Sequence, residues 1–257
     1  MGIVNVTPDS FSDGGQHATR DAALAHAQRL LQEGAHILDI GGESSRPGAP
    51  ALSEAEEWHR IAPVLTECLR WQVPISLDTY KPAIMQRALD LGVDILNDIW
   101  GLRQPGAVAA VAASRCGVCV MHMHGEPQTM QQQPLPGEGV QVVGEFLRER
   151  ADVLRAAGVA ADRIALDPGV GFGKTVEQNF ALLACQAELQ LPDHPWLVGW
   201  SRKSSLGAVT GLGVEQRLLP SVVAAVLAVE RGAHIVRVHD VAQTVSALAV
   251  WQAARPI

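Results

Sequence analysis

Short runs of apolar residues alternate along the whole chain with longer stretches that are rich in Ala and Leu. Most of the short runs are continuously apolar, which is typical of strands buried on both faces of a parallel sheet. Eight such runs predict β-strands, at residues 3–6, 36–40, 74–77, 94–96, 117–121, 164–166, 196–198 and 235–238.

The stretches between these runs carry recognisable helix ends. Ser53 and Glu56 have the spacing of a capping box and predict the start of one helix. Gly34 predicts the end of another, because glycine readily adopts the left-handed conformation that terminates helices. Pro82 suits the first turn of a third helix. Predicted strands and helices therefore alternate through the chain.

Eight strand–helix units with no linker between them predict an α/β fold, a (β/α)8 TIM barrel in which residues 1–257 form a single domain. A doubly wound open sheet is the competing architecture. That fold usually has fewer strands, and no dinucleotide-binding fingerprint follows the first predicted strand. We therefore favour the barrel.

The composition is that of a globular protein and argues against two kinds of partner. Of the 257 residues, 47% are hydrophobic and 18% are charged, which is too apolar for a disordered chain. There are 20 basic and 27 acidic residues with no run of Lys and Arg, so we expect no nucleic-acid partner. The longest apolar run, near residues 221–229, is too short to cross a bilayer, so we expect no membrane association.

Cysteine content indicates the compartment. Four cysteines in a chain of 257 residues do not form a disulfide scaffold, and the first residues do not resemble a secretory signal, so we expect a cytoplasmic protein. Cys116 and Cys119 have the CxxC spacing, but no second pair completes a zinc site. We expect both to be core thiols.

Every predicted strand ends in a polar or charged residue. In a barrel the chemistry lies on the loops that follow the strands, so these side chains are expected to converge. Asn and Asp also follow strands simply as turn formers, which accounts for one or two of them but not for the whole set. The set comprises Asn5, Asp39, Asp78, Asn97, His122, Asp167, residues 201–203, Arg237 and His239.

These residues divide into two chemical groups. Asp78, Asn97 and Asp167 offer mainly acceptors, which suit a flat heterocycle that bears amino and lactam groups. A second group supplies cations that can hold a phosphate, namely Arg46, Lys203, Arg237 and His239. Asn5 offers a hard oxygen for Mg²⁺, an ion that commonly binds substrate phosphate as well.

Three other features allow more than one interpretation. The glycine-rich stretch at residues 167–175 lacks the spacing of a phosphate-binding P-loop, and we expect its glycines to bring the backbone close to a ligand. His122 and His124 lack an evident third metal ligand, which favours a role in positioning a loop. Trp100 suits a wall of the site and core packing equally well.

Eight segments, in this order and across nearly the whole chain, resemble the signatures of bacterial dihydropteroate synthases. The longest is MGIVNVTPDSFSDGG at residues 1–15, whose TPDSFSDGG block is highly specific. The others are DIGGESSRPG at 39–48, SLDTYK at 76–81, NDI at 97–99, MHM at 121–123, DPGVGFGK at 167–174, SRK at 201–203 and RVH at 237–239.

The resemblance implies a barrel enzyme of folate biosynthesis. Enzymes of this family are transferases that condense 6-hydroxymethyl-7,8-dihydropterin diphosphate with p-aminobenzoate to give 7,8-dihydropteroate and pyrophosphate. Both substrates are small molecules, Mg²⁺ is the implied cofactor, and sulfonamides mimic p-aminobenzoate. Members of the family are homodimers, and the stretch at 221–230, apolar almost all round, suits a helix at an interface.

The resemblance also assigns roles to individual residues. Arg237 would stack on the pterin and reach the diphosphate together with His239, and Asn5 would bind Mg²⁺. The pterin would be held by Asp78, Asn97, Asp167 and Lys203, with Met121 and Met123 as further substrate contacts. A loop with Ser45, Arg46 and Pro47 would close over the site, and the p-aminobenzoate pocket would be lined by Phe172, Lys203 and Ser204.

The expected mechanism follows the movement of charge. Mg²⁺, Arg237 and His239 would stabilise the negative charge on the departing pyrophosphate, while Asp78 and Asp167 would favour positive charge on the pterin methylene. Lys203 completes the expected catalytic set. The arylamine is neutral at pH 7 and needs positioning more than a base, so we assign no nucleophile and no general base.

Three departures from the family pattern stand out. The first signature begins at residue 2, where relatives usually carry a leader that we expect to cover the barrel floor. Ser45 replaces a common Thr and keeps the hydroxyl, while Ser205 replaces a common aromatic residue.

Two alternatives compete with the synthase: a barrel that transfers a methyl group from methyltetrahydrofolate to a corrinoid, and a catalytically silent pterin-binding paralogue.

Overall fold

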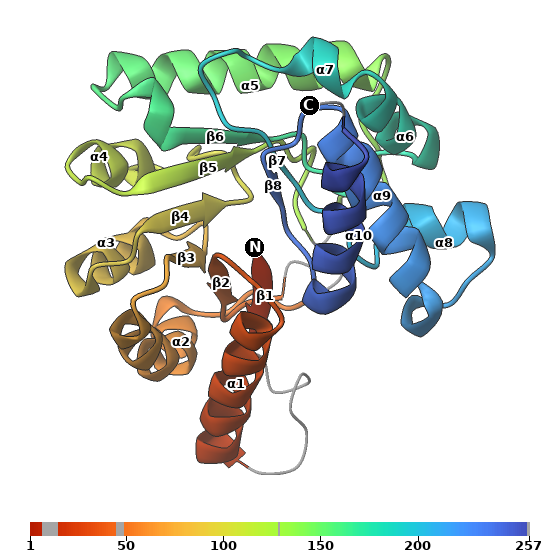
Figure 1. Cartoon of the computed structure of the whole chain (residues 1–257). Helices are drawn as coiled ribbons and strands as arrows, with labels where there is room; N and C mark the ends of the chain where they lie inside the picture. Colours follow the sequence, from red (N-terminus) through yellow and green to blue (C-terminus); the bar gives the residue numbers. More distant parts are fainter. Residues whose placement is uncertain (7–14, 45–48, 128, 256–257) are drawn as a thin grey trace.

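The computed structural model describes residues 1–6, 15–44, 49–127 and 129–255. Short parallel strands form its centre, and helices surround them on the outside (Figure 1). The strands are β1 (Gly2–Asn5), β2 (Leu38–Gly41), β3 (Ile75–Asp78), β4 (Ile95–Asp98), β5 (Gly117–Met121), β6 (Ile164–Asp167), β7 (Leu197–Val198) and β8 (Ile235–Val236). All eight lie where the apolar runs predict them.

The strands close into a ring. β1 to β6 form one parallel sheet in consecutive order, and β7 pairs with β8. Leu166 pairs with Trp196 just before β7, and Gly2 pairs with Val238 just after β8, each through a single parallel bridge. At the second bridge, the Ile3 N–H donates to the Val238 carbonyl at 3.1 Å. The predicted TIM barrel is therefore confirmed.

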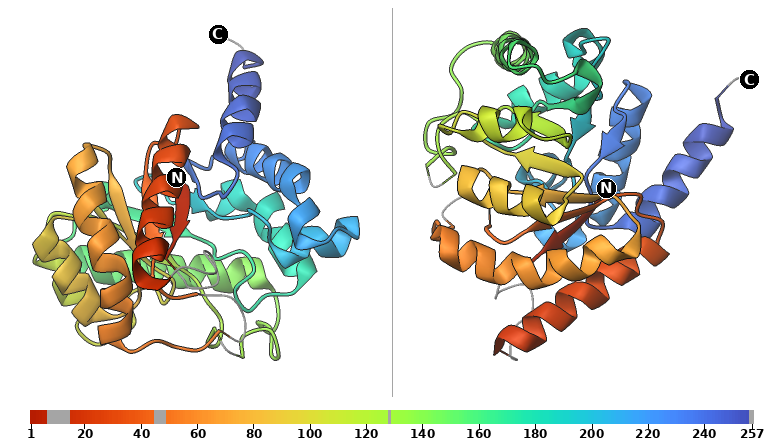
Figure 2. Two further views of the ribbon diagram at one scale, coloured as in Figure 1. Left: turned by 90° about the horizontal axis from the view of Figure 1, so that it is seen from below. Right: turned by 90° about the vertical axis from the view of Figure 1, so that its left-hand side faces the viewer.

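Helices pack around the strands in both views of Figure 2. They are α1 (Gly15–Gln32), α2 (Glu54–Cys68), α3 (Pro82–Leu91), α4 (Ala107–Ala112), α5 (Gly139–Ala156), α6 (Val176–Ala184), α7 (Gln186–Leu189), α8 (Ser204–Thr210), α9 (Leu218–Glu230) and α10 (Val241–Ala253). Short 3-10 helices occupy Leu69–Trp71, Ala161–Arg163 and Val214–Gln216.

The predicted helix ends are confirmed. The Ser53 hydroxyl accepts from the Glu56 N–H at 3.2 Å, and the Glu56 carboxylate accepts from the Ser53 N–H at 2.9 Å, which completes the capping box of α2. Gly34, two residues after α1, has a φ of +98°. α3 begins at Pro82. Local sequence signals therefore determine where these helices start and stop.

The main core lies between the strands and the helices. On β2, Leu38 and Ile40 are fully buried in this core, whereas Asp39 between them points to the opposite side, into the barrel. Cys116 and Cys119 are buried free thiols, as predicted. Among the residues that the structure describes, no helix is both long and apolar enough to cross a membrane.

Candidate active site

The register of the barrel places the predicted site residues side by side at the carboxyl ends of the strands. Asn5 on β1 pairs with Gly41 on β2, Gly41 pairs with Asp78 on β3, and Asp78 pairs with Asn97 on β4. Asn5, Gly41 and Asp78 are the last residues of β1, β2 and β3, and Asn97 is the last but one of β4, so they form one row across four consecutive strands. Asp167 ends β6 opposite Met121 of β5.

Arg237, just after β8, joins β2 and β3 through its guanidinium. Its Nε donates to Asp39 Oδ2 at 2.5 Å, and its Nη2 donates to Asp78 Oδ2 at 2.7 Å. Asn97 Nδ2 donates to the same Asp39 oxygen at 3.1 Å. Because a guanidinium has five N–H donors, three remain beyond these two bonds.

The charges of this cluster depend on burial. Burial raises the pKa of Asp78 to about 7, although Arg237 opposes the shift, and Asp39 adds to it. Burial lowers the pKa of Arg237, but Asp39 and Asp78 raise it by more, so the net shift is upward and the guanidinium stays charged. The barrel mouth thus holds a permanent cation between two carboxyl groups.

The end of β6 supplies a second acid–cation pair. Asp167 Oδ1 accepts from the Gly169 N–H at 2.7 Å, and burial raises the pKa of Asp167 to about 6. Burial lowers the pKa of Lys203 to about 8, an effect that the negative charge of Asp167 opposes. Lys203 Nζ lies 4.1 Å from the centroid of the Phe172 ring, within cation–π range. Asp167, Phe172 and Lys203 therefore form one edge of the mouth.

His239 is held by the loop after β7. The Ser201 hydroxyl accepts from the His239 backbone N–H at 3.1 Å and lies 2.9 Å from His239 Nδ1. Burial lowers the pKa of His239 to about 3, and the nearby Arg202 and Arg237 lower it further, so the imidazole is neutral near pH 7. A hydroxyl that donates to Nδ1 leaves the ring proton on Nε2. We expected a cation at His239 from the sequence, whereas the structure favours a neutral hydrogen-bond donor.

A small apolar cluster lines the same end of the barrel, separate from the main core. It contains the predicted site residues Met121, Met123 and Phe172 together with Ile99 and Met130, and Tyr80 and Trp100 pack against it. The rings of Tyr80 and Trp100 have centroids 5.7 Å apart. Trp100 therefore packs against predicted site residues, and a wall of the site and core packing both stay predictions for it.

Comparisons with known proteins identify the family. The model of the pterin-binding enzyme family matches residues 1–239. The dihydropteroate synthase of Neisseria meningitidis serogroup B is 51% identical over 260 residues, which cover 98% of this chain and 91% of the relative. The chain belongs to the dihydropteroate synthase family.

Solved structures agree with this assignment. The dihydropteroate synthase of Burkholderia cenocepacia, complexed with 7,8-dihydropteroate, has a TM-score of 0.90 and 53% identity, over 99% of this chain and 90% of its own. That of Xanthomonas albilineans, with 4-aminobenzoic acid, has a TM-score of 0.93 and 49% identity, over 100% of this chain and 93% of its own. The transferase function expected from the sequence is confirmed, and neither alternative is supported.

Part of the expected dihydropteroate synthase site lies outside the described residues. Ser45, Arg46 and Pro47 belong to this part, so their predicted role stays a prediction. Ser204 is the exposed first residue of α8. The neighbouring Ser205 is buried, and its hydroxyl accepts from Asn179 Nδ2 at 2.9 Å, which ties it to α6.

Sequence reasoning missed an ion-pair network that includes residues just after β2 and β3. Lys81 Nζ donates to Glu43 Oε2 at 2.5 Å, to Glu57 Oε2 at 2.7 Å and to the Leu52 carbonyl at 2.7 Å. The Tyr80 hydroxyl donates to Glu43 Oε1 at 2.9 Å. Glu43 and Lys81 lie in the signature segments at 39–48 and 76–81, and this position could have identified them from the sequence. Glu57 lies in no such segment.

Asp39 was recognised at a strand end but received no role. It is fully buried, it accepts from both Arg237 and Asn97, and its Oδ1 has no hydrogen-bond partner among the described residues. A charged residue inside an apolar strand run was the available signal. Asp39 therefore orients the Arg237 guanidinium toward the mouth.

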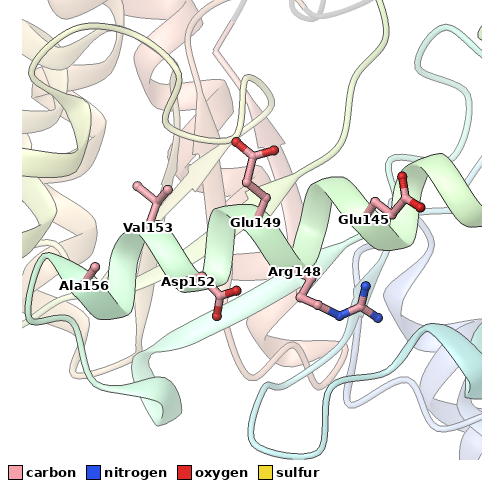
Figure 3. Close-up of a pocket in the computed structure, with 6 residues that line it drawn as sticks. All are labelled: Glu145, Arg148, Glu149, Asp152, Val153 and Ala156. Atoms are coloured by element: carbon pink, nitrogen blue, oxygen red, sulfur yellow. The ribbon is translucent and has the colours of Figure 1, made fainter.

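A hollow on the outer surface is unrelated to this mouth. Its lining residues all come from α5, namely Glu145, Arg148, Glu149, Asp152, Val153 and Ala156. Figure 3 shows Glu149 and Val153 on one side of the helix and Arg148 and Asp152 on the other, so these side chains do not converge. The hollow offers no catalytic arrangement.

Proposed function

We propose that this chain joins p-aminobenzoate to 6-hydroxymethyl-7,8-dihydropterin diphosphate at the barrel mouth around Arg237, within one domain that spans residues 1–257. The observation that carries the proposal is the fork of Arg237 between Asp39 and Asp78, which places an oriented cation beside the acceptors expected for a pterin. The Burkholderia and Xanthomonas relatives, with product or 4-aminobenzoic acid, support both substrate classes.

The pterin would lie among Asp78, Asn97, Asp167 and Lys203. Carboxylates accept from the amino and ring N–H groups, while the Asn97 amide and the Lys203 ammonium donate to the lactam. Arg237 would stack on the ring and use its remaining N–H donors for the diphosphate. These roles require no rearrangement of the strands, because each of these residues lies at or just after a strand end.

The arylamine would lie at the outer edge of the mouth, against Phe172, Lys203 and Ser204. The Lys203 ammonium above the Phe172 ring gives this edge a positive charge that suits the carboxylate of p-aminobenzoate. Met121 and Met123 of the neighbouring apolar cluster would contact the substrates from below. Ser45, Arg46 and Pro47 would cover the site.

Mg²⁺ fits this end of the barrel through Asn5. In the described part of the chain, no group of three or more His, Cys, Asp or Glu side chains is arranged to hold a metal. An ion at Asn5 would therefore depend on one amide oxygen, substrate phosphate and water, which is a common way of holding Mg²⁺. When bound, the ion would supply positive charge to the departing diphosphate.

The reaction breaks the bond between the pterin methylene carbon and the diphosphate oxygen and forms a bond from that carbon to the arylamine nitrogen. The leaving pyrophosphate takes the electron pair of the broken bond, and the nitrogen releases one proton. Arg237 would stabilise the charge that grows on the leaving group, and the neutral His239 would donate from Nε2. Asp78 and Asp167 would stabilise the positive methylene.

We further propose that the enzyme is a cytoplasmic homodimer. α9 and α10 carry apolar side chains on the surface, among them Leu219 (69% exposed), Val223 and Val250. Two copies that pack through this face would bury them. Free thiols at all four cysteines suit a reducing compartment.

Mass spectrometry of the reaction mixture tests the proposed function. Purified protein incubated with the pterin diphosphate, p-aminobenzoate and Mg²⁺ should form a product of the mass of 7,8-dihydropteroate. A sulfonamide should compete with p-aminobenzoate in the same assay. If no such product forms while the pterin still binds, the proposal is wrong.

A further inference from the structure

Lys174 is a buried lysine that the mechanism above does not use. Its side chain is 3% exposed, and its Nζ donates to the carbonyls of Gly169 at 2.8 Å, Phe172 at 3.1 Å and His122 at 3.2 Å. No carboxylate in the described part of the chain forms an ion pair with it. Three acceptors match the three N–H donors of an ammonium group.

These carbonyls belong to two different loops. Gly169 and Phe172 lie on the loop after β6, whereas His122 follows β5. The two loops touch through their backbones, since a Cβ on Gly169 would lie 1.9 Å from the His122 carbonyl oxygen and one on Gly173 would lie 2.2 Å from that of His124. The glycines were expected to bring the backbone close to a ligand; these two bring it close to the neighbouring loop.

Lys174 is thereby connected to the expected arylamine edge of the mouth through a single residue, Phe172. Its ammonium holds the Phe172 carbonyl, and the Phe172 ring lies 4.1 Å from Lys203 Nζ. Asp167 is also linked to Lys174, because its carboxylate accepts from the N–H of Gly169, whose carbonyl Lys174 holds. Its backbone, however, is anchored independently: Asp167 belongs to β6, and its carbonyl accepts from the His122 N–H at 3.0 Å within the sheet. Phe172 lies on the loop and has no such anchor in the sheet, so loss of the ammonium should disturb the Phe172 ring more than the Asp167 carboxylate.

We propose that Lys174 is a positioning residue for the arylamine: its ammonium holds the loop after β6 against the loop after β5 and so fixes the Phe172 ring where p-aminobenzoate binds. The inference rests on the proposed function, since it takes Phe172 as part of the arylamine pocket. Burial lowers the pKa of Lys174 to about 7, although the nearby Asp167 opposes the shift. An ammonium held by three carbonyls and by no direct ion pair is unfavourable for stability, which argues for a functional role.

The test is Lys174→Met, which keeps an unbranched side chain one atom shorter and removes the charge and all three donors. We expect the KM for p-aminobenzoate to rise about tenfold, which corresponds to a loss of about 1.4 kcal/mol of binding free energy from the displaced Phe172 ring. The Kd for the pterin diphosphate, measured by calorimetry, should change less than about threefold on the same scale. Gln131→Ala is the matched control, because Gln131 is an exposed neutral donor to the Gly171 carbonyl of the same loop.

Two results would overturn the inference: an unchanged KM for p-aminobenzoate, or equal losses of arylamine and pterin affinity, which would indicate general damage. A Lys174→Met variant that does not unfold cooperatively is not folded, and Lys174→Gln then replaces it with the same two criteria. If neither variant folds, Lys174 is a merely structural residue and the inference is wrong. Wild-type protein runs in parallel. An inactive wild type contradicts the proposed function, whereas an active wild type with an unaltered variant contradicts only the role of Lys174.

Discussion

Arg237 Nη2 lies 2.7 Å from Asp78 Oδ2, across a ring in which their strands, β8 and β3, are not neighbours. This contact joins the two chemical groups of the site, because Arg237 is the expected diphosphate ligand and Asp78 is an expected pterin ligand. The group proposed to stabilise the leaving charge is thus oriented by a group proposed to hold the reacting ring.

Arg237→Ala tests this arrangement through kcat. The guanidinium should matter most when charge develops on pyrophosphate, so kcat should fall roughly a hundredfold or more, while the Kd for the pterin diphosphate rises less than about tenfold. Steady-state kinetics and calorimetry measure the two quantities. Arg231→Ala is the control, since the Arg231 guanidinium donates to the Leu227 carbonyl at the surface. A normal kcat in Arg237→Ala would remove Arg237 from the catalytic set.

Pterin binding should depend on pH through two carboxyl groups. Burial raises the pKa of Asp78 to about 7 and that of Asp167 to about 6. Only the ionised forms accept two N–H groups, so the affinity for a 6-hydroxymethyl pterin without diphosphate should increase as the pH rises through these values. In Asp78→Asn the step near pH 7 should disappear. Calorimetry that finds an affinity independent of pH in the wild type would contradict this expectation.

The Asp78 carboxyl group should affect stability in the opposite direction: pterin affinity should increase with pH, whereas its contribution to stability should decrease. In the folded protein the pKa of Asp78 is about 7, whereas its ordinary value is 3.8. Between these pH values the folded state binds more protons at this site than the unfolded chain does, so this contribution to the free energy of unfolding decreases as the pH rises. Urea unfolding of the wild type and of Asp78→Asn across this range isolates the contribution as the difference between their pH profiles. Parallel profiles would contradict the assigned shift.

Lys81→Met should destabilise the protein strongly. It would leave Glu43 and Glu57 without their shared cation, and Glu57 is 1% exposed. Removal of one partner from a buried ion pair costs about 3–5 kcal/mol. Urea unfolding measures the change. Arg70→Met is the control, because Arg70 pairs with Glu67 at the surface and should lose at most about 1 kcal/mol. A similar small loss in Lys81→Met would show that the network contributes little to stability.

Leu219→Glu tests the proposed dimer face. Leu219 is 69% exposed on α9, so the substitution should leave the folded subunit intact and place a charge in the interface. Analytical ultracentrifugation should then find a dimer for the wild type and a monomer for the variant. The control is Val142→Glu on α5, which should remain dimeric. A monomeric wild type would refute the homodimer directly.

Local patterns predicted the barrel and most residues at its mouth, because apolar runs mark the strands and a polar residue ends each one. They could not predict the partners of those residues. Arg237 and Asp39 are 198 positions apart, and only ring closure brings them together.

The charge state of His239 and the role of Lys174 were beyond sequence reasoning for a related reason. The low pKa of His239 results from burial and from the neighbouring Arg202 and Arg237, all of which are properties of the folded loops. The three carbonyls around Lys174 are backbone groups that no side-chain pattern reveals. The spacing of Gly169 and Gly173 was visible in the sequence, but their close approach to the loop after β5 was not.

Pyrophosphate release by the purified protein tests the central claim most directly. The protein is incubated with the pterin diphosphate and Mg²⁺, with and without p-aminobenzoate, and wild type is compared with Arg237→Ala. We predict that pyrophosphate release requires p-aminobenzoate and that its rate falls when Arg237 is replaced. Release that is equally fast without p-aminobenzoate, or that persists at the wild-type rate in Arg237→Ala, would contradict a condensation carried out by this cluster.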